Sequence, residues 1–129
     1  MSLENKKILL VDDEPFILSA TAQLLRSSGY EVHMCEQWTG VATVVRKERP
    51  DLILLDYNMP GIKGDDICRI LKKNDLGDQM KIFIYSSEPD DTLPDITMRA
   101  GADGYLKKSC PGPVLLERLG SILGVSASA

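Results

Sequence analysis

The sequence predicts a single α/β domain built on a parallel sheet that helices cover on both faces. Two observations lead to this fold class. Short continuous apolar runs, such as those over 8–11 and 53–55, are bounded by acids or turn residues and are typical of strands buried on both faces. Segments with apolar residues at helical spacing alternate with these runs, and such alternation favours parallel strands joined by right-handed crossovers. A length of 129 residues is typical of one domain.

The first part of the chain predicts three strands and two helices. Pro15 suits the first turn of a helix, where its missing N–H has no intrahelical partner, and Gly29 ends that helix. The second helix ends before Pro50, because a residue that precedes proline disfavours the helical conformation. The predicted strands are 8–11, 31–35 and 53–55, and the predicted helices are 15–28 and 38–48.

The second part of the chain continues the same alternation. Apolar residues at helical spacing predict a third helix over 65–73, a fourth and weaker one over 94–100, and a fifth that begins at Pro111 or Pro113. Strands are predicted over 81–85 and 104–106. The chain therefore holds five predicted strands and five predicted helices.

The composition argues against several classes of function. A formal net charge of −4 disfavours a nucleic-acid surface, because contacts to backbone phosphates need a basic patch. No apolar run is as long as a membrane span and no signal-peptide pattern opens the chain, so we expect a cytoplasmic protein that binds no membrane. Cys35, Cys68 and Cys110 are odd in number and widely spaced, which favours buried thiols over a disulfide framework or a zinc site.

Four predicted strands end in residues that can carry chemistry: Asp12 and Asp13, then Asp56, Ser86 and Lys107. The carboxyl ends of parallel strands meet at one edge of the sheet, where neighbouring strands stand about 5 Å apart. We therefore expect these five side chains to converge. Three crowded carboxylates repel one another, and a hard divalent cation such as Mg²⁺ relieves that repulsion.

A lysine and a hydroxyl beside such a cation site indicate that an anion binds there. Phosphoryl transfer uses this combination of a metal, a lysine, a hydroxyl and a nucleophilic carboxylate. Asp56 is the candidate nucleophile, because it stands alone in its loop while Asp12 and Asp13 form a pair suited to the metal. Lys107 and Ser86 are the candidate ligands of the phosphoryl oxygens.

Each of these residues also has a simpler interpretation. By itself, a pair of acids such as Asp12 and Asp13 caps a helix as often as it binds a ligand, and Asp13, before Glu14 and Pro15, is the candidate cap. Ser86 is a common turn residue, and Lys107 alone is a solvated charge. His33, the only histidine, is interpreted as a structural surface residue of a strand, with a phosphohistidine carrier as the alternative. The functional interpretation depends on all four groups ending strands of the same sheet.

The order of these motifs resembles the receiver domain of two-component response regulators. Two aspartates follow the first strand, D-x-x-M-P-G follows the third from Asp56 to Gly61, a serine follows the fourth, and a lysine follows the fifth. The resemblance covers residues 6–124, with 1–5 and 125–129 as tails, and it implies the flavodoxin-like doubly wound (βα)5 fold with strand order 2-1-3-4-5. In place of the proline that usually follows the lysine, Lys108 follows Lys107.

The resemblance also implies roles for residues. Asp56 is the expected phosphoacceptor, and Asp13, Asp56 and the backbone carbonyl of Asn58 are expected to bind Mg²⁺ directly, with Asp12 binding through water. Ser86 and Lys107 would hold the phosphoryl oxygens. Ser86 and Tyr105 are the expected switch residues, through which phosphorylation changes the surface of the fourth helix and fifth strand.

The expected partners are a histidine kinase or phosphotransfer protein, a downstream protein or output domain, and a second copy of the chain in a homodimer. The expected function is a signalling switch rather than an enzyme, with self-catalysed phosphotransfer and slow autodephosphorylation. Two alternatives stay open: a receiver-like scaffold that is not phosphorylated, and a magnesium-dependent phosphohydrolase.

Overall fold

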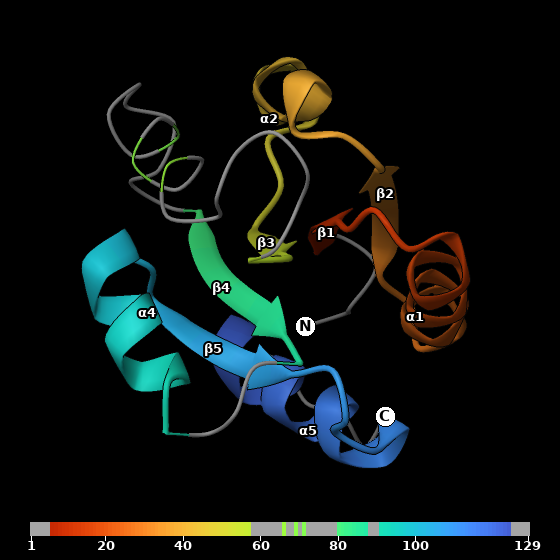
Figure 1. The fold of residues 1–129 in the computed structure, drawn as a ribbon. Helices are drawn as coiled ribbons and strands as arrows, with labels where there is room; N and C mark the ends of the chain where they lie inside the picture. Colours follow the sequence, from red (N-terminus) through yellow and green to blue (C-terminus); the bar gives the residue numbers. More distant parts are fainter. Residues whose placement is uncertain are drawn as a thin grey trace.

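The computed structural model describes residues 6–57, 66, 69, 71, 80–87 and 91–124. Its strands form one five-stranded parallel sheet in the order β2-β1-β3-β4-β5, so the predicted fold class and strand order are confirmed (Figure 1). The strands are β1 (Lys7–Val11), β2 (Glu31–Cys35), β3 (Leu52–Leu55), β4 (Lys81–Ser86) and β5 (Gly104–Lys107).

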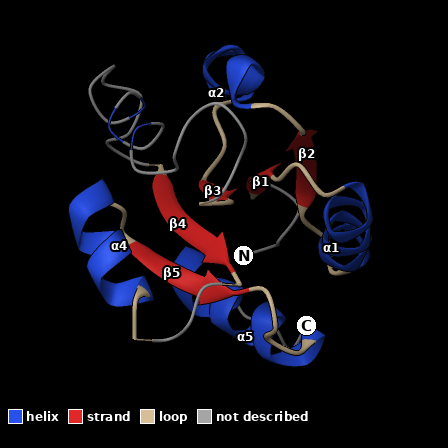
Figure 2. Ribbon diagram, in the orientation of Figure 1, coloured by secondary structure: helices blue, strands red, loops and turns tan. Residues whose placement is uncertain are grey.

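The described helices lie on both sides of this sheet (Figure 2). They are α1 (Pro15–Ser27), α2 (Val41–Glu48), α4 (Leu93–Ala100) and α5 (Gly112–Leu123), and a 3₁₀ turn over Trp38–Gly40 precedes α2. The predicted helix over 38–48 is therefore shorter as an α-helix than expected. Of the predicted helix over 65–73, only Asp66, Arg69 and Leu71 are described, and all three are helical.

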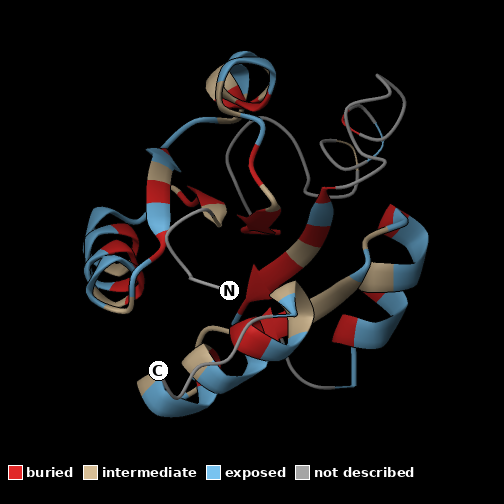
Figure 3. Ribbon diagram, turned by 180° about the vertical axis from the view of Figure 1, so that it is seen from behind, coloured by how far each residue is buried: buried red, intermediate tan, exposed pale blue. Residues whose placement is uncertain are grey.

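Two apolar layers fill the space between the sheet and the helices. Leu9, Ile53 and Ile82 belong to the layer that α2 and α4 cover, and Ile8, Leu52 and Leu54 belong to the layer that α1 and α5 cover. Successive residues of a strand point to opposite faces, so a strand with both faces covered is apolar throughout. All four residues of β3 are accordingly buried, and the buried positions concentrate in the central strands (Figure 3).

Backbone hydrogen bonds extend the sheet one residue beyond its strands at the carboxyl edge. The N–H of Asp12 donates to Cys35 O at 3.1 Å, and the N–H of Asp56 donates to Val11 O at 2.9 Å. At the other side of the sheet, the N–H of Lys108 donates to Ser86 O at 2.9 Å. Asp12, Asp56 and Lys108, which follow three of the strands, are thus fixed in place by backbone hydrogen bonds to the neighbouring strands.

None of the helices in the described ranges combines the length and the apolar character needed to cross a lipid bilayer.

Candidate functional site

Asp12, Asp56 and Lys108 lie at the carboxyl edge and share one face of the sheet. Asp12 follows Leu10 by two residues, Asp56 follows Leu54, and Lys108 follows Leu106, and these three leucines pack in the layer under α1 and α5. Because strand side chains alternate with a period of two, all three polar groups leave the sheet on that same side. The alternation therefore brings two carboxylates and an ammonium together.

The ammonium of Lys108 is surrounded by carboxylates. Its Nζ lies 2.8 Å from Asp12 Oδ2, 3.4 Å from Asp56 Oδ2 and 3.2 Å from Glu14 Oε1. The side chains of Lys108, Asp12 and Asp56 are 6%, 4% and 6% exposed, whereas Glu14 is 56% exposed. Charges this deeply buried are stable only when they are paired, so Lys108 and the two aspartates depend on one another.

These contacts set the protonation state of Lys108. Burial alone lowers the pKa of a lysine, because it disfavours the charged form. The contact with Asp12, the charge of Asp56 and the hydrogen bond to Glu14 act in the opposite direction, and together they raise the pKa of Lys108 above its ordinary value. The lysine is therefore a fixed positive charge at neutral pH.

The start of α1 positions the acidic pair. Glu14 is the residue that precedes the helix, and its backbone N–H donates to Asp12 Oδ1 at 2.9 Å. No side chain caps this helix, so the alternative in which Asp13 is the cap is wrong. The other oxygen of Asp12, Oδ2, is buried, and its partner is the ammonium of Lys108 at 2.8 Å.

The acidic groups fit a divalent cation. Oxygens of Asp12, Asp13, Glu14 and Asp56 all lie within 4.8 Å of one another. Mg²⁺ is bound in proteins by one or two carboxylates and several waters at about 2.0–2.1 Å, so two of these oxygens are enough to hold it. Asp12 Oδ2 is buried and paired with the ammonium of Lys108 at 2.8 Å, and a carboxylate oxygen can accept a second partner, such as a cation or one of its waters. The cluster is typical of a Mg²⁺ site.

Ser86 and Tyr105 belong to the opposite face of the sheet. Ser86 is the last residue of β4 rather than the residue after it, and it is 1% exposed. Tyr105 pairs in register with Ile84 and is half-buried against the apolar layer under α2 and α4. Ser86 is two residues beyond Ile84, so both predicted switch residues leave the sheet on one side, at neighbouring positions of adjacent strands.

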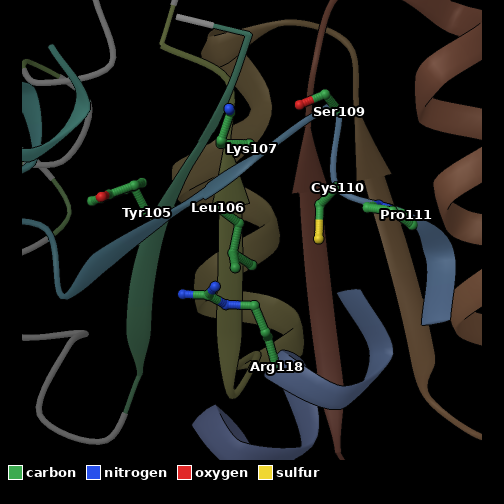
Figure 4. Close-up of a pocket in the computed structure, with 7 residues that line it drawn as sticks. All are labelled: Tyr105, Leu106, Lys107, Ser109, Cys110, Pro111 and Arg118. Carbon is green, nitrogen blue, oxygen red and sulfur yellow. The ribbon is translucent and has the colours of Figure 1, made fainter. Parts of the chain in front are cut away.

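The lysine that reaches the carboxylates is Lys108, not the predicted Lys107. Lys107 is the register partner of Ser86, and it lines a cavity of about 460 Å³ at the outer edge of β5, together with Tyr105 and Arg118 (Figure 4). The difference arises because consecutive strand residues point to opposite faces. The residue after the site lysine is thus Ser109, again not proline, and the described peptide bonds are all trans.

Two site residues were missed by the sequence interpretation, and one lies outside the described residues. Glu14 and Lys108 were the ones missed: each stands next to a residue of the same charge that was chosen, because only the first two acids of D-D-E and the first lysine of K-K received a role. Asn58, the predicted carbonyl ligand of the metal, is outside the described part of the chain.

Comparison with known proteins identifies the family to which the chain belongs. A family model described as the response regulator receiver domain matches residues 8–120. The DNA-binding response regulator MtrA of Mycolicibacterium smegmatis is 32% identical over 119 residues, which cover 92% of this chain and 51% of that protein. The phosphate regulon transcriptional regulatory protein PhoB of Pseudomonas aeruginosa is 33% identical over 118 residues, covering 92% of this chain and 52% of that protein.

Solved structures give a matching result. The BeF3-activated N-terminal receiver domain of Klebsiella pneumoniae RstA superposes with a TM-score of 0.82 at 31% identity and covers 92% of this chain and 98% of its own. The chemotaxis response regulator CheY4 of Vibrio cholerae gives a TM-score of 0.83 at 26% identity, with 91% and 98% covered. The chain spans about half the length of the curated relatives it matches. By its fold, its acidic pocket with Lys108, and the family model that covers most of its length, the chain belongs to the response regulator receiver domains, which are signalling switches rather than classical enzymes.

Proposed function

We propose that Asp56 accepts a phosphoryl group from the phosphohistidine of a histidine kinase or of a phosphotransfer protein. The observation that carries this proposal is the pairing of Asp56 with Lys108 at the carboxyl edge of the sheet, at an N–O distance of 3.4 Å. In open α/β sheets this edge is where ligands bind. A carboxylate at this edge, held next to a lysine and a pocket of further carboxylates, is suited to receive a phosphoryl group.

The proposed step is an in-line displacement at phosphorus. A carboxylate oxygen of Asp56 forms a P–O bond while the P–N bond of the phosphohistidine breaks. The electron pair of the broken bond stays on the imidazole nitrogen, and the product is an acyl phosphate. No general base is needed, since a carboxylate is ionised at neutral pH and loses no proton when it attacks.

The residues of the chain supply positive charge and a hydrogen-bond donor for this step. Lys108 lies where it can bind an oxygen of the new phosphoryl group, and its raised pKa keeps it charged while it does so. Ser86, at the end of the neighbouring strand, is proposed to donate its hydroxyl hydrogen to another oxygen. Mg²⁺ held by Asp12, Asp13 and Asp56 would neutralise charge on the transferring group. Lys107 is not part of this proposal.

We further propose that the acyl phosphate changes the surface formed by α4 and β5. A phosphoryl group on Asp56 draws the Ser86 hydroxyl toward it, and the half-buried ring of Tyr105 on the adjacent strand then turns into the space that Ser86 leaves. This would couple the site to residues that a partner contacts. The receiver unit is proposed to be residues 6–124, with 1–5 and 125–129 as tails.

Two curated relatives have names that describe a DNA-binding response regulator and a transcriptional regulatory protein. We propose by analogy that this receiver controls an output domain or a downstream protein, and that a second copy of the chain is a further partner. Nucleic acid is not proposed to bind through this domain, whose net charge is −4.

Phosphorylation by acetyl phosphate with Mg²⁺, followed by intact mass, tests the proposal. We expect one phosphoryl group on the wild-type chain, none on Asp56→Asn, and one on the control Asp95→Asn, which removes an exposed carboxylate on α4. Labelling that persists in Asp56→Asn would contradict the site. A wild-type chain that is never labelled would instead favour the scaffold, and continuous turnover of a phosphoester would favour the phosphohydrolase.

A further inference from the structure

A second cluster of metal-ligating side chains lies away from the proposed phosphorylation site. Glu31 and His33 occupy alternate positions of the edge strand β2, and Glu48 is the last residue of α2. The Nε2 atom of His33 is 2.8 Å from Glu31 Oε2 and 3.4 Å from Glu48 Oε1. One ligand atom of each residue lies within 4.8 Å of the other two.

This cluster is separate from the acidic pocket. His33 pairs in register with Leu9, which is three residues before Asp12 on β1. At a rise of about 3.3 Å per residue, His33 therefore lies roughly 10 Å from Asp12 along the strand direction. The two groups of ligands share no residue.

The two carboxylates of the cluster share too few hydrogen-bond donors. Nε2 of His33 can carry one hydrogen at most, whether the ring is neutral or protonated, so it donates fully to only one of the two carboxylates. The nearby ammonium of Lys7 is 3.9 Å from Glu31 Oε2 and 3.8 Å from Glu48 Oε1, beyond hydrogen-bond distance. Its hydrogen bond goes instead to the backbone oxygen of Glu48 at 3.1 Å.

We propose that His33, Glu31 and Glu48 bind a divalent zinc ion, with water as the fourth ligand. Imidazole and carboxylate are common zinc ligands, with bonds of about 2.0–2.2 Å, which places the ligand atoms of a tetrahedral site roughly 3.3–3.5 Å apart. The separation of 3.4 Å between His33 and Glu48 already matches this geometry. Glu31 has to move outward from 2.8 Å, which its exposed side chain permits.

A substitution of Lys7 distinguishes a zinc site from a surface network of ion pairs. Its ammonium repels a metal ion held by Glu31 and Glu48, so it is a competitor for the same carboxylates. Replacing Lys7 by methionine should therefore strengthen zinc binding severalfold. In an ion-pair network without a metal site, the same change creates no zinc binding.

His33 is the only histidine of the chain, so the nitrogen NMR signals of its ring report this site alone. Zinc is titrated into the full chain with excess Mg²⁺ present to compete at the acidic pocket. We expect the Nε2 signal to shift and to saturate at one equivalent, both in the wild type and in Asp56→Asn. By calorimetry, Glu48→Gln should weaken zinc binding at least tenfold, whereas the exposed control Glu36→Gln should leave it unchanged.

Two results would overturn the proposal. One is an Nε2 signal that stays in place while zinc binds elsewhere, in which case the acidic pocket accounts for the binding. The other is a zinc affinity of Glu48→Gln equal to that of Glu36→Gln. The far-ultraviolet circular dichroism of each variant shows whether the chain is folded, and Glu48→Asp tests the site again if Glu48→Gln is not.

Discussion

Replacement of Lys108 by methionine should destabilise the metal-free protein markedly. The substitution keeps most of the aliphatic stem but removes the ammonium that lies 2.8 Å from Asp12 and 3.4 Å from Asp56. Both carboxylates then remain buried without that cation. Removing one partner of a buried charge pair costs about 3–5 kcal/mol. Because the third carboxylate beside Lys108, that of Glu14, is 56% exposed and keeps its hydration, we expect the lower value, about 3 kcal/mol.

Urea unfolding at pH 7 with a chelator present measures this loss, and the neighbouring lysine provides a matched control. Lys107→Met removes the same charge one residue earlier, on the other face of β5, and leaves both buried aspartates paired with Lys108, so it should cost less than Lys108→Met. Added Mg²⁺ should reduce the cost of Lys108→Met, because the metal replaces the missing positive charge among the carboxylates.

The difference in unfolding free energy between the wild type and Lys108→Met should depend on pH in a defined direction. The pKa of Lys108 is raised in the folded protein, since the contact with Asp12 and the charge of Asp56 outweigh the opposing effect of burial. Its contribution to stability is therefore complete below the unfolded-state pKa of about 10.4 and is lost as the pH rises through the higher folded value. The difference between wild type and Lys108→Met should stay constant from pH 7 to about 10 and shrink above that pH.

The reasoning is refuted if Lys108→Met and Lys107→Met unfold at the same urea concentration. It is also refuted if the stability difference between wild type and Lys108→Met grows, rather than shrinks, in strongly alkaline solution.

Three further predictions concern the sheet and the site. Gly104→Ala places a Cβ 2.6 Å from a ring carbon of Phe83, so it should cost about 1–3 kcal/mol in urea unfolding, and adding Phe83→Leu should recover part of that loss. Ser86→Ala should slow labelling by acetyl phosphate about tenfold, the equivalent of one hydrogen bond to a charged group, whereas the exposed Ser87→Ala should not. Mg²⁺ at 100 times its dissociation constant should raise the unfolding free energy by about 2.7 kcal/mol, and Asp13→Asn should largely abolish this gain.

The fold was predictable because its signals are local and redundant. The strands β1, β3 and β4 contain short apolar runs, and turn residues such as Gly29 and Pro50 separate the elements. The limits of the strands were less accurate, since they depend on pairing with a neighbour. Ser86, expected just after its strand, belongs to β4 because Lys107 of β5 pairs with it.

The start of α1 shows how a site contact can escape a sequence pattern. The sequence offered the pair Asp12 and Asp13 as candidates for the helix cap, with Asp13 named as the cap, whereas the residue at that position is Glu14. The structure uses the Asp12 side chain to accept the N–H of Glu14, which frees the Glu14 carboxylate to reach Lys108, 94 residues away in the sequence. A contact over that separation depends on the topology of the sheet, which no local window of residues contains.

The choice between Lys107 and Lys108 depends on the alternation of side chains, and this alternation cannot be seen in a strand that is buried on both faces. A half-exposed strand alternates polar and apolar residues, so its pattern shows which positions share a face. Leu52 to Leu55 are apolar at every position, and the sequence therefore does not show that Asp56 leaves on the side of Leu54. Once the α1 side is known to hold Leu54 and Leu106, the residue two positions after Leu106 has to be the partner of Asp56, and that residue is Lys108.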